Sequence, residues 1–267
     1  NGAATLSAGR GLTLGGTNVL AGNVSLTGAN VTVSGTTTAS QGFTASAQGT
    51  VDTSAAQIYV THDASLSGAT VKSGSMIVGG SLTESATQAM TTSGQTLVAG
   101  AATFNAGSGS FTNAANNQVL TGGALTVNAG TIANGSGAAL ASTSTTALTA
   151  TSNMTNAGTI NGQTTTINVG GNLANGGGTI LGSNAVSIST GTLSNGNGLV
   201  IAGNPFQAGA TTGNLSLTVT GGTGAFDNTS GQISVAKDAA FSLANMAWDP
   251  SAAASGGIYA GGQLSMT

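Results

Sequence analysis

The only histidine of the chain has an acid beside it, a pairing from which a catalytic base and the group that orients it could be built. His62 and Asp63 are consecutive, and Asp52 is the nearest acid before them. Catalysis by such a group also needs a nucleophile held in place by packed neighbours. Residues 61–63 directly follow the alternating run 58–60, so we interpret them as a solvated turn and predict no catalytic residue there.

Other carboxylates could cleave a polysaccharide or bind a metal ion. Such enzymes gather several carboxylates in one groove, often with Arg, Lys or a divalent ion, whereas the interval between Asp227 and Asp238 does not match the repeat of the chain described below. Residues 221–227 resemble a single copy of the calcium-binding nonapeptide repeat, which works by stacking copies, and their Asp comes one position late. We therefore predict no enzyme activity, no metal site and no cofactor.

A few aromatic side chains could bind a ligand instead. Trp248, the only tryptophan, lies near Tyr259, and Pro205 and Phe206 are adjacent. Aromatic side chains exposed on a surface can stack on a sugar ring or dock a protein receptor. The alternative interpretation, which we favour, is that Trp248 and Tyr259 fill a widened part of the core or pack a loop against it.

The composition excludes several classes of function. Of 267 residues only 3% are charged, against about 25% in an average domain, while 39% are hydrophobic and the net charge is -3. Arg10, Lys72 and Lys237 are the only basic residues besides His62, so no phosphate-binding patch can form and we expect no nucleic-acid partner. There is no Cys for disulfides or thiolate metal sites. No run of about 18 apolar residues predicts a membrane-spanning helix.

The elements that must hold these residues are short β-strands. Gly, Ser, Thr and Asn are abundant and no apolar stripe has a helical period, which argues against helices. Short runs instead alternate apolar and polar side chains between Gly or Asn residues, as at 12–14, 24–26, 125–127 and 186–188. Residues 36–38 and 86–92 are interpreted as irregular corners.

The strands recur at a regular interval along the chain. Ile160, Ile180 and Val200 are spaced 20 apart. A second pattern, an apolar residue, any residue and then Asn, recurs at Asn113, Asn156, Asn175, Asn195 and Asn228. This period predicts an all-β parallel β-helix of about 12 to 14 coils, roughly 20 residues each, whose narrow interior disfavours aromatic side chains. The repeated Asn side chains are expected to point inward and hydrogen-bond one another from coil to coil.

The repeat covers the whole chain. We predict one β-helical segment over residues 1–267, and interpret it as part of a longer protein because the pattern is running at both ends. The step from Leu193 to Phe226 is clearly longer than one period, which predicts a projecting loop around 202–212, where Pro205 cannot donate a backbone hydrogen bond. Residues 245–257 are expected to form a second irregular stretch.

These repeats resemble a known family. Residues 156–160 and 175–180, with the Gly-Gly-Asn-Leu sequence at 170–173, are similar to the haemagglutinin repeats of filamentous haemagglutinin-type exoproteins. That group includes bacterial adhesins and contact-dependent growth-inhibition effector proteins, all exported by two-partner secretion. The resemblance implies a right-handed β-helical shaft, secreted to the outer cell surface of a Gram-negative bacterium.

From the resemblance we expect a structural stalk that displays an adhesive or toxin-delivery region away from the cell and can itself be adhesive. The implied partners are the outer-membrane transporter of two-partner secretion and an unidentified target-cell receptor or glycan. Exposed edge strands at the ends of the fragment also predict end-to-end self-association. Two alternatives stay open: a receptor- or glycan-binding module of a contact-dependent growth-inhibition protein, and a β-helical polysaccharide-degrading enzyme.

Overall fold

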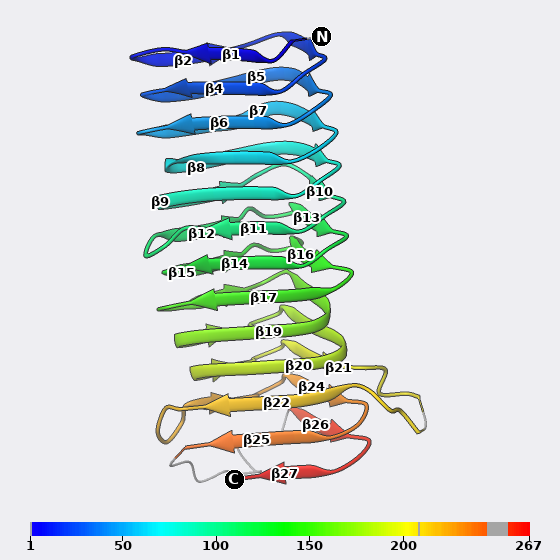
Figure 1. Cartoon of the computed structure of the whole chain (residues 1–267). Helices are drawn as coiled ribbons and strands as arrows, with labels where there is room; N and C mark the ends of the chain where they lie inside the picture. The colour runs from blue at the N-terminus through cyan, green and yellow to red at the C-terminus, as the bar shows by residue number, and fades with distance from the viewer. Residues whose placement is uncertain (1, 208, 245–255) are drawn as a thin grey trace.

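The computed structural model describes residues 2–207, 209–244 and 256–267, and in these residues the chain is a parallel β-solenoid. It has strands but no helix, and about 12 coils follow one another at intervals of roughly 21 residues. The coils stack as a rod with the chain ends at opposite ends, and the chain winds in a right-handed sense (Figure 1). The predicted all-β parallel β-helix is confirmed.

Each coil passes through three faces, which we call face A, face B and face C in chain order. Face A contains the strands β1 (Ala4–Ser7), β4 (Val24–Gly28), β6 (Phe43–Ala47), β11 (Ala102–Asn105), β14 (Leu125–Ala129), β17 (Thr145–Ala150), β22 (Asn214–Val219), β25 (Ala239–Leu243) and β27 (Leu264–Met266). Face B contains β2 (Gly11–Leu14), β12 (Ser110–Asn113), β15 (Thr131–Asn134), β18 (Met154–Asn156) and β23 (Phe226–Asp227). Face C contains β3 (Thr17–Leu20), β10 (Thr96–Val98), β13 (Gln118–Thr121), β16 (Ala139–Ser142), β21 (Leu199–Ala202), β24 (Gln232–Val235) and β26 (Gly257–Ala260).

The remaining strands bend around corners and serve more than one face. These are β5 (Asn30–Ala39) and β7 (Thr50–Val60) on faces B and C, β8 (Ala64–Val78) on all three faces, β9 (Leu82–Thr92) on faces A and B, and β19 (Thr159–Ala174) and β20 (Thr179–Ser194) on all three. Residues 36–38 and 86–92, expected to be irregular corners, therefore lie within strands β5 and β9. Thr37 points inward and is fully buried, so the alternation continues through a segment of β-branched polar residues.

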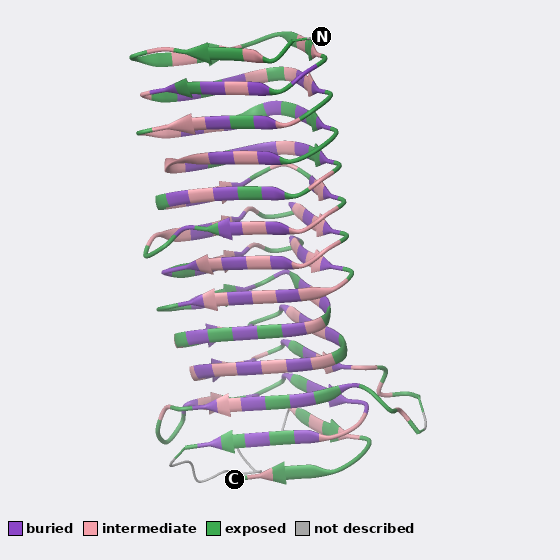
Figure 2. Cartoon of the chain, viewed as in Figure 1, coloured by how far each residue is buried: buried purple, intermediate pink, exposed green. Residues whose placement is uncertain are grey.

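Parallel pairing holds every coil to the next. Strand β19 pairs with β20 over almost its full length, from Thr159 opposite Thr179 to Ala174 opposite Ser194. Along most strands buried and more exposed residues alternate, and this pattern repeats in successive coils, whereas the first and last coils are largely exposed (Figure 2). The inward side chains are mainly Val, Leu, Ile and Ala and form one continuous core along the rod.

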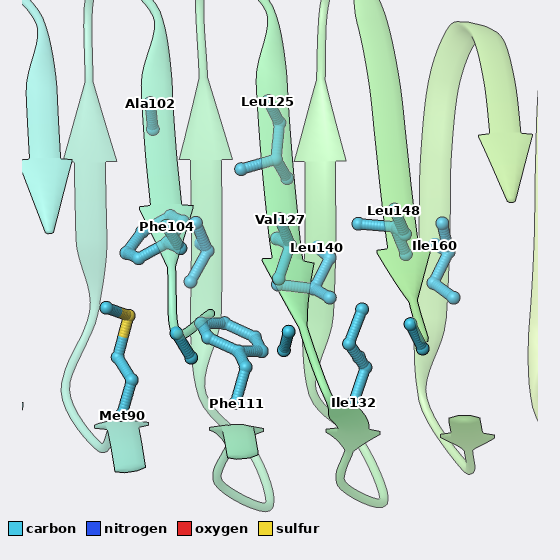
Figure 3. Close-up of a cluster of buried hydrophobic side chains, with 14 of the residues drawn as sticks. Met90, Ala102, Phe104, Phe111, Leu125, Val127, Ile132, Leu140, Leu148 and Ile160 are labelled. Atoms are coloured by element: carbon cyan, nitrogen blue, oxygen red, sulfur yellow. The ribbon is translucent and has the colours of Figure 1, made fainter. Parts of the chain in front are cut away.

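The core holds more aromatic side chains than the narrow interior predicts. Phe43, Phe104, Phe111 and Phe241 are fully buried, and the rings of Phe104 and Phe111 lie 5.3 Å apart between centroids (Figure 3). Ala102 and Ala106 flank Phe104 on the same inward side of the chain and are themselves buried. Small neighbours within a coil thus leave the volume that the large rings fill.

No helix long and apolar enough to cross a membrane occurs among the described residues.

Candidate functional site

The repeated Asn side chains form a hydrogen-bonded column inside the rod, at the end of face B. We call this column the Asn ladder. It runs from the hydroxyl of Thr92 through Asn113, Asn134, Asn156, Asn175 and Asn195 to Asn228. In each step from Asn113 onward, Nδ2 of one Asn donates to Oδ1 of the next at 2.7–2.8 Å. All six Asn side chains are buried.

The second N–H group of these amides closes the corner between faces B and C. Asn134 Nδ2 donates to the carbonyl oxygen of Thr159, the first residue of the next face C strand, at 3.2 Å. Asn156 makes the same contact with Thr179 and Asn175 with Leu199, both at 3.3 Å. Thr159, Thr179 and Leu199 also pair with the preceding coil on face C. The ladder amides therefore add a second donor to carbonyls of the paired strands, and both N–H groups of each amide have an acceptor, which is the condition for burying an amide at low cost.

Sequence reasoning missed Asn134 in this ladder. Ile132, Ala133 and Asn134 fit the pattern of an apolar residue, any residue and Asn, and Ile132 pairs with Phe111 one coil earlier. The signal was present, because residues 111 and 132 are 21 apart. Thr92, which starts the ladder, has no such signal because a hydroxyl replaces the amide at that register.

A buried carboxyl group, Glu84, was also missed. It is fully buried on β9 and pairs with Leu66 of the coil before and Phe104 of the coil after. Ser73 donates to Glu84 Oε2 at 3.2 Å, whereas Oε1 has no hydrogen-bond partner among the described residues. Burial raises the pKa of Glu84 to about 8, and the hydrogen bond from Ser73 lowers it by a smaller amount. The sequence signal that Glu84 points inward was its position two residues after the inward Leu82, since inward residues alternate along a strand.

Glu84 does not form a catalytic group with other acids. It faces the interior of the rod, and the described residues contain no cluster of three or more His, Asp, Glu or Cys side chains that could hold a metal ion. A single carboxyl enclosed by Leu66 and Phe104 offers no substrate a route of approach. We interpret it as a protonated polar group of the core.

The exposed aspartates hold corners of the coil. Asp52 accepts hydrogen bonds from the backbone N–H and hydroxyl of Ser54, at 3.0 and 2.6 Å. Asp63 accepts from the N–H of Ser81 one coil later at 2.7 Å, and Asp238 accepts from Gln263 at 2.9 Å. Asp227 accepts from Thr229 at 2.9 Å. Each side chain thus caps a backbone donor at a turn, a common role for Asp.

His62 lies with Asp63 at the corner between β7 and β8, and its side chain is exposed. Its backbone N–H donates to the carbonyl of Gln41 in the preceding coil at 3.4 Å. The geometry agrees with a solvated turn, the interpretation given to this segment from sequence.

The aromatic candidates meet at one hollow near the carboxyl end. Pro205 and Phe206 lie in the segment between β21 and β22, which projects from the rod (Figure 1). Together with Tyr259 and Lys237 they line a hollow of about 400 Å³. Phe206 is 96% exposed and Tyr259 53% exposed, so Tyr259 does not fill the core. Trp248 lies outside the described residues, as do residues 245–255 of the stretch expected to be irregular.

The projecting segment is an insertion into a short corner. In the preceding coil only residues 183 and 184 separate the paired positions Gly182 and Ala185, whereas residues 203–213 separate Ala202 and Asn214. The two ends of the insertion nearly touch, since a Cβ on Gly203 would lie 2.7 Å from the Cα of Gly213. The loop therefore leaves the rod and returns without disturbing the coil above or below.

Comparison with protein-family models, curated proteins and solved structures gives no match to this chain.

Proposed function

We propose that the chain is a rigid spacer in a large secreted exoprotein on the outer surface of a Gram-negative bacterium, where it holds an adhesive or toxin-delivery region away from the cell. One observation carries the proposal: strand pairing, core and Asn ladder continue without a break through most of the rod. A solenoid of this kind gains length by adding equal units, each held by its neighbours. The secretion class rests on the resemblance to filamentous haemagglutinin-type repeats.

The spacer is tested by measuring its length and stiffness. The chain has no Cys, so Thr17→Cys with Tyr259→Cys places one label on the first coil and one on the last. A rigid rod gives a narrow distance distribution near roughly 50 Å, since about 11 steps of roughly 4.8 Å separate them. A flexible chain of this length would give a broad distribution with a mean of about 90 Å. A broad distribution would overturn the proposal.

The cellular part of the proposal needs a separate measurement. Its partners are the outer-membrane transporter of two-partner secretion and a receptor or glycan on the target cell. Antibodies against the chain should label intact cells of the producing bacterium. Labelling that appears only after the cells are permeabilised would contradict an exported spacer while leaving the rod itself in place.

A second candidate function is receptor or glycan binding at the hollow beside the projecting loop. The observation that favours it is the meeting of Phe206 and Tyr259, both exposed, with Lys237 at one hollow. Aromatic faces with a nearby charged group suit a sugar ring or a receptor loop.

Removing the loop separates this function from the spacer. Deleting residues 204–212 joins Gly203 to Gly213 and leaves a two-residue corner like that at residues 183 and 184. We expect the melting temperature to change little, because the described residues of the deleted segment belong to no strand. If binding to target cells or to a glycan array is equal for the deletion, for Tyr259→Ala and for the intact chain, the hollow is not the binding site.

We further propose that the chain has no catalytic activity and that its ends associate with one another in solution. Among the described residues the aspartates hold turns, as described above, and the one buried acid, Glu84, is enclosed. The release of reducing ends from any glycan in a panel would contradict the first statement. In the part of the chain that the structure describes, each end of the rod has strands with one unpaired edge: β1–β3 at one end, β26 and β27 at the other. An unpaired edge can pair with a strand of another copy of the chain.

A further inference from the structure

Face C presents an apolar column to solvent along the length of the rod. One residue near the middle of each face C segment aligns with its equivalent in the next coil. In chain order this column, the face C column, contains Val19, Thr38, Tyr59, Ile77, Leu97, Leu120, Ala141, Asn161, Leu181, Ile201, Ser234 and Tyr259.

Four residues of this column are exposed to water, most of the others are half-buried, and Ser234 is buried at 7%. Val19 is 76% exposed, Ile77 46% and Tyr59 39%. Four consecutive coils carry Tyr59, Ile77, Leu97 and Leu120, so these side chains form a continuous ridge. Exposed apolar surface that is contiguous over several residues marks an interaction site, whereas single exposed apolar residues do not.

Face A and face B differ from face C at the equivalent positions. On face A the outward residues of successive coils include Ser65, Thr83, Thr103 and Thr126. On face B the outward column contains Asp52 and Lys72. The apolar column is therefore a property of one face and does not follow from the repeat itself.

From these observations we infer that face C is a lateral interface through which two copies of this chain pack side by side. A partner must match apolar side chains that recur at the spacing of the coils, about 4.8 Å, and a second rod has that spacing along its whole length. The outward positions of face C carry no charged side chain among the described residues. Two copies of this face can therefore approach without like-charge repulsion.

The column is also self-complementary in both symmetric arrangements. With a two-fold axis along the rod, each residue faces its own copy. With a two-fold axis across the rod, the column pairs Val19 with Tyr259, Thr38 with Ser234, Tyr59 with Ile201, Ile77 with Leu181, Leu97 with Asn161 and Leu120 with Ala141. In four of these six pairs both residues are apolar. The pair of Thr38 with Ser234 joins two hydroxyls, and only the pair of Leu97 with Asn161 joins an apolar residue to a polar one. An isologous interface requires such self-complementarity.

The area of face C is sufficient for a stable dimer. About 12 strands spaced by roughly 4.8 Å, each about four residues or roughly 13 Å long, cover about 700 Å² on each copy. The total of about 1,400 Å² lies within the range of specific protein–protein interfaces. Sheets that pack face to face lie about 10 Å apart with their side chains interdigitated, which the regular ridge allows.

Sedimentation of the intact 25.1 kDa chain tests the inference. We expect a side-by-side dimer at high micromolar concentration, and we expect Ile77→Lys with Leu97→Lys, which places charge in the middle of the ridge, to abolish it. The matched control is Thr83→Lys with Thr103→Lys, which adds the same charge to the outward side of face A on neighbouring strands and should leave the dimer intact. Ile77→Ser with Leu97→Ser weakens the ridge without charge and should raise the dissociation constant at least tenfold.

Circular dichroism identifies any variant that fails to fold, and X-ray scattering identifies the type of dimer. A side-by-side dimer keeps the maximum dimension close to that of the monomer, whereas an end-to-end dimer nearly doubles it. A wild-type chain that forms no side-by-side dimer at any concentration, or a side-by-side dimer that the ridge variants leave unchanged, would overturn the inference. An end-to-end dimer alone would support only the association of the chain ends and would likewise overturn it.

Discussion

Glu84 shows how one side chain can set the pH response of the molecule. Its carboxyl is enclosed in the core with one hydrogen bond from Ser73, and its pKa is raised to about 8 by burial. In the unfolded chain the same group titrates near 4.5. Between these two values the folded chain keeps a proton that the unfolded chain releases, so the free energy of unfolding falls as the pH rises.

We therefore expect the contribution of Glu84 to the free energy of unfolding to be greatest below about pH 4.5. Between about pH 4.5 and 8 the free energy of unfolding should fall by up to about 1.4 kcal/mol for each pH unit. Glu84→Gln keeps the shape and removes the titration, so its free energy of unfolding should be nearly independent of pH over this range. Urea unfolding at several pH values measures both. Asp63→Asn, at an exposed corner, is the control and should keep the wild-type slope; an unchanged slope in Glu84→Gln would contradict the assignment.

A second prediction at this scale concerns the Asn ladder. In Asn175→Ala, Asn156 loses its acceptor and Asn195 loses its donor inside the core. Two buried groups left without partners cost about 2–6 kcal/mol, which should appear as a lower midpoint of urea unfolding. Asn168→Ala, at an exposed position of β19, should change the midpoint little. Equal effects of the two substitutions would show that the ladder does not stabilise the rod.

The amino-acid sequence predicted the Asn ladder, whereas it did not reveal the buried Glu84. Five of the Asn residues follow from a pattern that recurs with the coil, and the structure places all of them in one column. Glu84 occurs once, so no repeat could reveal it, and only the alternation along residues 82–84 indicates that it points inward. Tyr259 was expected to fill a widened part of the core or to pack a loop against it, and the first of these predictions was wrong, because Tyr259 lies on an outward position of β26 and is 53% exposed.

At the scale of elements, the corner that follows each Asn of the ladder determines where glycine is needed. Asn197 has a positive φ of 57° and Gly177, at the same corner one coil earlier, has 72°, a region that Asn and Gly adopt more easily than other residues. The next residue in each corner is also Gly. A Cβ on Gly198 would collide with the carbonyl oxygen of Asn175 and with the Asn195 side chain.

Gly198→Ala should therefore lower the stability by more than about 2 kcal/mol, because the backbone of two adjacent coils would have to separate. Gly222, also in a corner, has open space around the position of a Cβ, so Gly222→Ala should be neutral or slightly stabilising. Thermal unfolding of the two variants measures the difference. A neutral Gly198→Ala would mean that the coils can move apart at little cost.

The strands of the second half were predictable and those of the first half less so, for a physical reason. From Asn113 onward most corners contain Asn or Gly at a fixed register, so the coil period is visible. Before that point the corners differ in sequence from coil to coil, so the period is harder to see. Polar segments such as residues 36–38 are held in strands by their neighbours on both sides, a constraint that a single sequence does not show.

At the scale of the whole molecule, the coils behave as exchangeable units. Residues 159–178 make up one coil, because Thr159 pairs with Thr179 and the ladder passes from Asn156 through Asn175 to Asn195. If these residues were deleted, the sequence around the new peptide bond would stay Gly-Thr-Ile, because residues 158–160 and 178–180 are both Gly-Thr-Ile.

Deleting residues 159–178 should therefore give a folded rod shorter by about 4.8 Å, with Asn156 bonded directly to Asn195. Deleting residues 159–168 instead removes half a coil and places apolar side chains on the wrong faces, so this control should not fold. Circular dichroism and X-ray scattering distinguish the two. If both deletions unfold, the coils are not equivalent; if both fold, the strand register is not fixed by the core.

The Asn ladder also gives the rod a direction, because every amide from Asn113 to Asn195 donates toward the carboxyl end. The last coil of a partly folded chain would always present a free N–H group, and the following coil brings the oxygen that fills it. Each added coil again leaves one free N–H group on its ladder Asn. A nucleus formed at the amino-terminal end would therefore be extended one coil at a time. We expect the time needed to complete such a rod to rise in simple proportion to the number of its coils.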